Sequence, residues 1–77
     1  MKLGMGSGMS AFKIKLNGKD FEIGSGTTLS RLLETIGIKP QGIAVELNLE
    51  VVPKSKYKET PLRDGDRIEI VRMVGGG

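Results

Sequence analysis

Two short segments of alternating apolar and polar residues meet at Asn17-Gly18, and this feature constrains the fold more than any other. Apolar residues occupy every second position from Phe12 to Leu16, and the alternation resumes beyond the Asn-Gly pair through Phe21 and Ile23. A period of two places an apolar set on one face of a β-strand. Asn-Gly tolerates the positive φ angles of a two-residue hairpin turn. The sequence therefore predicts a β-hairpin with one apolar face.

A short amphipathic helix is predicted after the hairpin. Thr28 is expected to cap its first turn and Gly37 to end it, and Pro40 lies just beyond. Between the caps, apolar residues follow the helical spacing i, i+3, i+4 and i+7. They are Leu29, Leu32, Leu33 and Ile36.

Shorter strands are predicted in the second half of the chain. Alternation over residues 43–47 indicates a third strand, and Val51-Val52 a fourth that ends at Pro53, because proline has no N–H for a ladder. Residues 54–63 are expected to be irregular, with a turn at Asp64-Gly65.

The last predicted strand covers residues 67–74. Ile68 and Ile70 share one of its faces, whereas Val71 and Met73 share the other with Glu69. The first and last strands are expected to be parallel neighbours, because the helical connection lets distant segments pair.

A chain of 77 residues has room for one core. One helix with four or five strands predicts an α+β fold in which the helix packs across one face of a mixed sheet. The Gly-rich residues 1–8 are interpreted as a disordered expression scar, residues 9–74 as the domain and residues 75–77 as a flexible glycine tail.

The composition argues against an enzyme. There is no Cys and no His, which removes the commonest nucleophiles, bases and metal ligands, so no catalytic residue, metal or bound cofactor is expected. The net charge is only +3, and the one basic cluster is interpreted as a solvated loop rather than a nucleic-acid site. Its members are Lys54, Lys56 and Lys58. No apolar run approaches the ~20 residues that span a membrane.

Three motifs with possible chemistry are better explained as ordinary structure. Residues 24–26 read Gly-Ser-Gly but lack the remaining glycines or Lys of a phosphate-binding loop. Asp64 and Asp66 flank a glycine but do not continue into a calcium loop. Glu46 and Glu50 show no sign of burial and are interpreted as solvated carboxylates.

The glycine tail is the strongest candidate for a functional element. Gly75, Gly76 and Gly77 carry no side chains, so the tail fits a narrow channel and ends in a carboxylate. Adenylation would turn that carboxylate into an electrophile that a sulfur or nitrogen nucleophile can attack. The alternative is an inert linker or frayed end.

Four stretches of the second half resemble a known family. They are GIAVELN at residues 42–48, EVVPKSKY at 50–57, TPLRDGDRIEIV at 60–71 and VGGG at 74–77. They resemble the ThiS family, the sulfur carriers of thiamine biosynthesis, and the resemblance covers nearly all of residues 9–77. One departure is Leu49, where many members have Gly, and it is expected to alter the turn after Asn48. The leader at residues 1–8 is also foreign to the pattern.

The resemblance implies a ubiquitin-like β-grasp fold and a cytoplasmic carrier. Gly77 would be adenylated by the E1-like enzyme ThiF, which uses MgATP, then converted to a thiocarboxylate by a persulfide donor. The thiocarboxylate would give its sulfur to the thiazole synthase ThiG. Gly76 would complete the required pair, and Gly75 would extend the reach of the tail.

The alternation also suggests a partner surface. If Ile68 and Ile70 face the helix, then Val71 and Met73 lie on the open face of the sheet, with Ala44 nearby. We expect these residues to dock the adenylating enzyme and the synthase. Because this surface is small and must stay open, we expect the chain to be monomeric alone. Two alternatives stay open, namely the small subunit of molybdopterin synthase and a β-grasp binding module with an inert tail.

Overall fold

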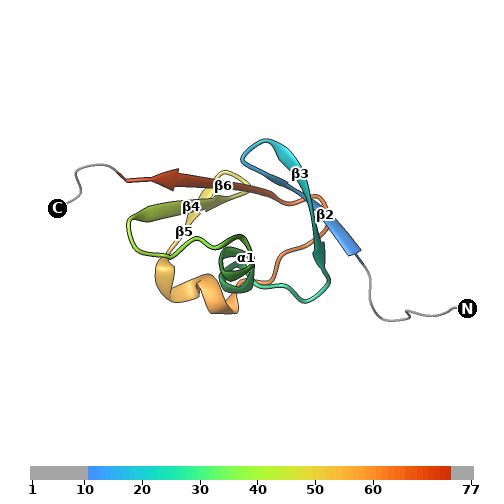
Figure 1. Ribbon diagram of the computed structural model, residues 1–77, viewed down its shortest axis with the longest axis horizontal. Coiled ribbons are helices and arrows are strands. Elements are labelled where there is room, and N and C mark those ends of the chain that lie inside the picture. The colour runs from blue at the N-terminus through green and yellow to red at the C-terminus, as the bar shows by residue number, and fades with distance from the viewer. Residues whose placement is uncertain (1–10, 74–77) are drawn as a thin grey trace, which may run out of the picture.

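The predicted hairpin is present in the computed structural model, which describes residues 11–73 (Figure 1). Strands β2 (Ala11–Leu16) and β3 (Lys19–Gly24) are antiparallel, with Leu16 opposite Lys19 across the turn. Asn17 and Gly18 have φ angles of 49° and 84°. Both turn residues are therefore left-handed, as a two-residue hairpin requires.

Helix α1 (Leu29–Ile36) has the predicted caps. The Thr28 side chain accepts a hydrogen bond from the Arg31 N–H at 3.2 Å. At the other end, Gly37 is left-handed with φ 78°, and the N–H of Ile38 donates to the Leu33 carbonyl at 2.9 Å. These bonds satisfy main-chain groups that a helix end leaves unpaired.

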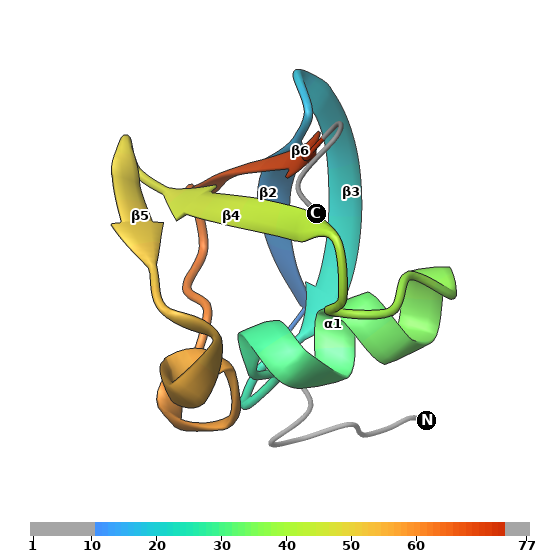
Figure 2. The same ribbon diagram turned by 90° about the vertical axis from the view of Figure 1, so that its left-hand side faces the viewer.

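Five strands form one mixed sheet in the order β3-β2-β6-β4-β5. The remaining strands are β4 (Ile43–Leu47), β5 (Glu50–Val52) and β6 (Arg67–Arg72). Strands β2 and β6 are parallel, as predicted, and the other neighbours are antiparallel. Figure 2 shows α1 on one side of this sheet. The predicted α+β fold, a β-grasp sheet with one helix across it, is confirmed.

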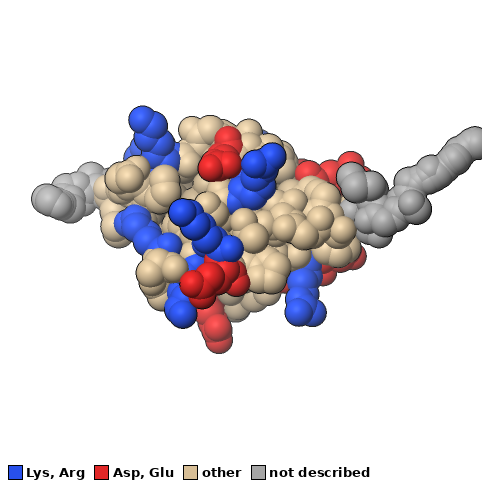
Figure 3. Space-filling view, turned by 90° about the horizontal axis from the view of Figure 1, so that it is seen from below, with Lys and Arg blue, Asp and Glu red and all other residues tan. Residues whose placement is uncertain are grey.

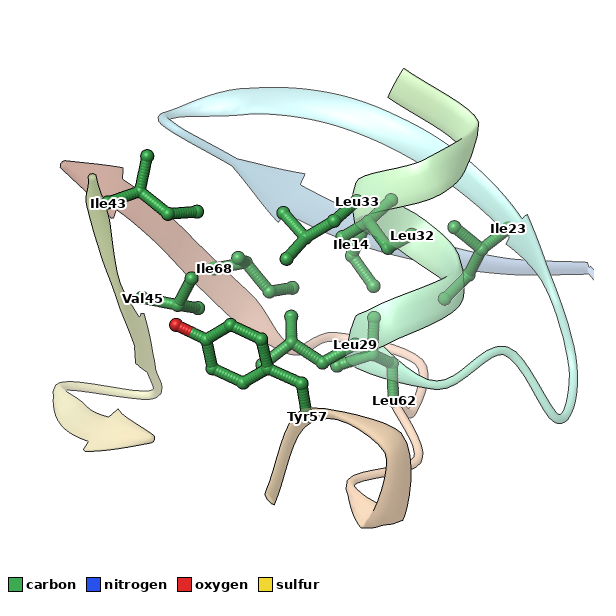
Figure 4. Close-up of a cluster of buried hydrophobic side chains, with 10 residues drawn as sticks. All are labelled: Ile14, Ile23, Leu29, Leu32, Leu33, Ile43, Val45, Tyr57, Leu62 and Ile68. Atoms are coloured by element: carbon green, nitrogen blue, oxygen red, sulfur yellow. The ribbon is translucent and has the colours of Figure 1, made fainter. Parts of the chain in front are cut away.

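The core lies between α1 and the sheet (Figure 4). Ten buried apolar side chains from the helix, the strands and the segment between β5 and β6 meet there. They are Ile14, Ile23, Leu29, Leu32, Leu33, Ile43, Val45, Tyr57, Leu62 and Ile68. The apolar faces of the strands and the apolar stripe of the helix therefore face the same core.

The prediction that residues 54–63 are irregular is wrong for the first part of that segment. Residues Lys54–Glu59 form the short 3₁₀-helix η1, which places Tyr57 in the core with 4% of its surface exposed. The three lysines around Tyr57 stay exposed, on a helical turn rather than a loop. Only Tyr57 of this helix is buried, and one apolar residue gives no periodic pattern from which a helix could be predicted.

Strand β6 is shorter than predicted. It ends at Arg72, and Met73 follows it without strand geometry, although the Met73 N–H still donates to the Gly42 carbonyl at 2.9 Å. Val74 lies outside the described residues. So do residues 1–8 and the glycines at 75–77, for which the predicted scar and tail stay predictions.

Candidate functional site

The open face of the sheet carries apolar side chains near the end of β6. Val71 is 50% exposed and Met73 51%, although both are large and apolar. Ala44 on β4 is the cross-strand neighbour of Val71, so the register brings these two residues together. Met73 lies two positions further along, beside β4 through its bond to Gly42.

Two further exposed residues, which the sequence analysis did not include, extend this surface. Leu49, in the turn between β4 and β5, is 82% exposed, and Val51 on β5 is 67% exposed. Leu49 and Val71 line one shallow hollow of about 540 Å³. We call Ala44, Leu49, Val51, Val71 and Met73 the open-face patch. The exposure of Val51 could have been predicted from the alternation of its strand, because Val51 pairs with Glu46 on this face.

The turn after Asn48 has the left-handed geometry of a two-residue hairpin turn, with Leu49 in the position that glycine often takes. The expected difference from family members with Gly stays a prediction. Asn48 and Leu49 have φ angles of 52° and 73°, nearly those of Asn17 and Gly18. The Asn48 side chain supports this geometry, because its oxygen accepts from the Arg67 N–H and its nitrogen donates to Asp66, both at 3.0 Å. A leucine thus occupies a position that favours glycine.

Charged residues share the hollow with the patch. Glu46 and Glu69 are direct cross-strand neighbours on β4 and β6, and Arg67 also lines the hollow. Glu50 instead pairs with Leu47, one position out of phase with Glu46, so the two glutamates point to opposite faces. The structure does not bring Glu46 and Glu50 together as an acid-base pair.

The aspartates of the last turn have structural partners. Asp64 accepts a hydrogen bond from the Lys13 N–H, and Asp66 accepts one from the Arg63 N–H, each at 2.8 Å. The Gly65 N–H donates to the Lys13 carbonyl at 2.8 Å. The turn therefore fastens β6 to β2.

The Gly24-Ser25-Gly26 segment is also a turn. The Thr27 hydroxyl donates to the Gly24 carbonyl at 2.6 Å, and the Thr27 N–H donates to the same oxygen at 3.2 Å. Gly26 has a φ of 88°. These bonds close a strand-to-helix connection, as predicted.

The helical side of the molecule mixes charges of both signs (Figure 3). Two ion pairs lie on its helices, Arg31 with Glu34 and Lys56 with Glu59, each at 3.7 Å. Both pairs are largely exposed and so contribute little to stability.

Residues 11–73 contain no group of three metal-ligating side chains. No helix in this range is long and apolar enough to cross a membrane. The candidate site is the open-face patch together with the end of β6, from which the chain continues to Gly75, Gly76 and Gly77. Those three glycines lie outside the described residues.

Comparison with known proteins gives a consistent family assignment. The family model described as the ThiS family matches residues 14–77. A sulfur carrier protein ThiS from Bacillus subtilis is 42% identical over 65 residues, which cover 83% of this chain and 98% of that protein. A crystal structure of the thiamine biosynthesis protein ThiS from Geobacter metallireducens matches with a TM-score of 0.76 and 29% identity. The match covers 86% of this chain and 100% of the Geobacter chain.

A much longer relative also matches. A thiazole synthase from Paramagnetospirillum magneticum is 42% identical over 65 residues, which are 84% of this chain and 20% of that protein. The chain thus spans about a fifth of the length of this relative.

Proposed function

The chain belongs to the ThiS family, and on this premise we propose that it is a sulfur carrier for thiazole formation in thiamine biosynthesis. It is then a protein co-substrate rather than an enzyme. The observation that carries the proposal is the extent of the family match, which runs through the described domain to Gly77. The absence of Cys and His fits this role, because the reacting group belongs to the main chain.

The proposed chemistry takes place on the carboxylate of Gly77. This carboxylate attacks the α-phosphate of MgATP on an E1-like adenylating enzyme, and pyrophosphate leaves. The acyl adenylate has AMP as a good leaving group, so a persulfide sulfur can attack the carbonyl carbon and displace it. A second thiol then attacks the donor's sulfur in the acyl disulfide, so that a new disulfide joins the two thiols and the thiocarboxylate leaves.

The geometry of β6 supports this use of the tail. The strand is paired with β4 as far as Arg72, and Met73 keeps a hydrogen bond to Gly42. The domain therefore holds the tail at a fixed point. Beyond it, Gly75 and Gly76 add length without side-chain bulk.

The thiazole synthase relative supports a specific partner. In that protein, a segment similar to this chain lies within a much longer chain. A carrier and a synthase joined in one chain would be expected to work together, because linkage raises their effective concentration. We propose that thiazole synthase receives the sulfur from this carrier.

The first test is intact mass spectrometry after incubation with MgATP, the cognate adenylating enzyme and a sulfide source. We expect a mass gain equal to the exchange of one oxygen for one sulfur, mapped to Gly77. A chain that lacks Gly76 and Gly77 should show no gain while its circular dichroism spectrum is unchanged. If the full chain gains no mass with an enzyme that is active on another carrier, the tail is inert and the chain is a binding module.

The second test concerns the open-face patch as a docking surface. Replacing Val71 and Met73 with Asp puts two charges where an apolar contact is proposed, so adenylation should slow at least about tenfold. Neither residue is in the core, so the urea midpoint should stay close to that of the parent. Lys19→Glu, on the far edge strand β3, is the matched surface control. Unchanged adenylation by the double variant would exclude this patch from docking.

A further inference from the structure

Strand β6 extends past its parallel neighbour. The pairing of β2 with β6 covers Lys15 with Arg67 and Leu16 with Ile68, and the chain then turns at Asn17. Figure 1 shows β6 continuing beyond this hairpin turn. On the β2 side, the last part of β6 therefore has no neighbouring strand among residues 11–73.

The Asn17 side chain takes the place of one more residue of β2. Its oxygen accepts from the Ile70 N–H at 2.7 Å, and its nitrogen donates to the Ile70 carbonyl at 3.2 Å. An amide side chain thus completes the ladder for one residue. It reaches no further along β6, so the next outward-facing residue is Arg72.

The main chain of Arg72 faces this gap. Arg72 is opposite Ile43 on β4, and the Met73 N–H donates to the Gly42 carbonyl at 2.9 Å. That bond makes Arg72 and Ile43 a non-hydrogen-bonded antiparallel pair. The N–H and carbonyl of Arg72 therefore point away from β4, toward the side that β2 has left. Such groups are a template for an added strand.

An apolar groove runs beside this edge on the helix side of the sheet. It has a volume of about 360 Å³ and is lined mainly by aliphatic side chains, which are Leu16, Ile36, Ile38, Ile43 and Ile70. A second hollow of about 380 Å³ adjoins it and shares Ile38, Ile43 and Arg72. Alternate side chains of an added strand would point into this space.

The charge at the groove has one sign. Among residues 11–73, Arg72 and Lys39 are the only ionisable residues that line the two hollows. Neither takes part in the ion pairs found within residues 11–73. The groove is therefore complementary to a segment that carries carboxylates as well as apolar side chains.

We propose that an extended acidic and apolar segment of a partner protein binds here as an added strand beside the end of β6. Its main chain pairs with the N–H and carbonyl of Arg72, and alternate apolar side chains enter the groove. A carboxylate on that same face of the segment meets Arg72 and Lys39, which line the two hollows. This binding mode deepens the proposed function. The site itself does not depend on that function, and only the identity of the partner rests on it. A partner bound in this way would contact the carrier next to the point where its C-terminal tail begins.

The test is an NMR titration of the full chain with the capped hexapeptide Val-Thr-Val-Thr-Asp-Thr, whose two valines and aspartate share one face of an extended strand. We expect shifts at Ile70 and Arg72 and slower exchange of the Arg72 amide at millimolar peptide. The control peptides carry lysine in place of aspartate, or N-methyl groups that block main-chain pairing. Both should bind at least about fivefold more weakly.

A charge-swap variant keeps the test specific. Arg72→Glu should weaken the aspartate peptide and strengthen the lysine peptide, each at least about threefold, whereas Lys19→Glu on β3 should change neither. The proposal is overturned if millimolar peptide leaves Arg72 unshifted, if the shifts lie at β3 or β5, or if the N-methylated peptide binds equally well. No enzyme or nucleotide is present in this titration, so its failure would leave the sulfur-carrier proposal intact. A failed sulfur transfer would likewise leave this result standing.

Discussion

At the scale of single residues, Leu49 combines backbone strain with exposure. A left-handed conformation costs an L-residue roughly 1–2 kcal/mol, because its Cβ approaches the following carbonyl oxygen. Leu49 has a φ of 73° and is 82% exposed, so burial of its side chain offsets little of that cost. Residues held in such conformations tend to occur at functional positions. Its position in the open-face patch fits that tendency.

Leu49→Gly should therefore stabilise the folded domain. Relief of the strain is partly offset by the greater freedom of glycine in the unfolded chain, so the net gain is about 0.5–1 kcal/mol. Urea denaturation followed by circular dichroism measures it. Leu49→Ala is the matched control, because it removes the side chain but keeps the strain. A gain of equal size in the alanine variant would show that the exposed side chain, and not the φ angle, is responsible.

At the scale of elements, the parts with local signals were predictable from sequence. Asn17-Gly18 defines a turn by itself, and Thr28 and Gly37 mark the ends of α1, so neither needs the rest of the fold. The end of β6 depends instead on where its neighbours stop, and no pattern in residues 67–74 carries that information. Alternation predicted the exposure of Val71 and Met73. It did not predict that the main chain of Arg72 faces away from β4 with no neighbouring strand there among residues 11–73.

The 3₁₀-helix η1 shows a different limit of sequence reasoning. Its one buried residue, Tyr57, lies among three lysines, and a basic run usually indicates a solvated segment. Here the lysines stay in water while the ring packs against the core (Figure 4). Tertiary packing therefore decides the structure of this element.

Burial of Tyr57 gives a pH prediction for η1. Burial raises the pKa of the Tyr57 phenol, because it disfavours the charged form. The unfolded chain then loses the proton first. Stability from this group is thus intact below about pH 10 and falls as the pH rises further, by at most ~1.4 kcal/mol per pH unit.

Urea unfolding at a series of alkaline pH values measures this loss, with Tyr57→Phe as the control that lacks it. Tyr57 is the only tyrosine and there is no tryptophan, so ultraviolet absorbance follows its ionisation directly. Identical pH dependence in the parent and the phenylalanine variant would contradict the prediction.

At the scale of the whole molecule, the two faces of one sheet have separate tasks. The helix side holds all ten buried core residues, whereas the open face carries the patch proposed for docking. Strand β6 belongs to both, because Ile68 lies in the core while Val71 is half exposed, and it also leads to the tail. Changes on the open face should therefore alter partner binding with little effect on folding.

Substitutions in the core should be severe, because the core is small. A domain of this size has ~3–5 kcal/mol from a single core, and Leu→Ala at a fully buried site costs ~2–5 kcal/mol. Leu32 is fully buried against the sheet, so Leu32→Ala should lose at least about 2 kcal/mol and be largely unfolded at moderate temperature. Val71→Ala, on the open face of the same sheet, should stay within about 0.5 kcal/mol of the parent. Thermal and urea denaturation of both variants measure the difference. If the two variants lose similar stability, then the open face contributes to the core energy, and a loss of adenylation in patch variants would no longer report docking alone.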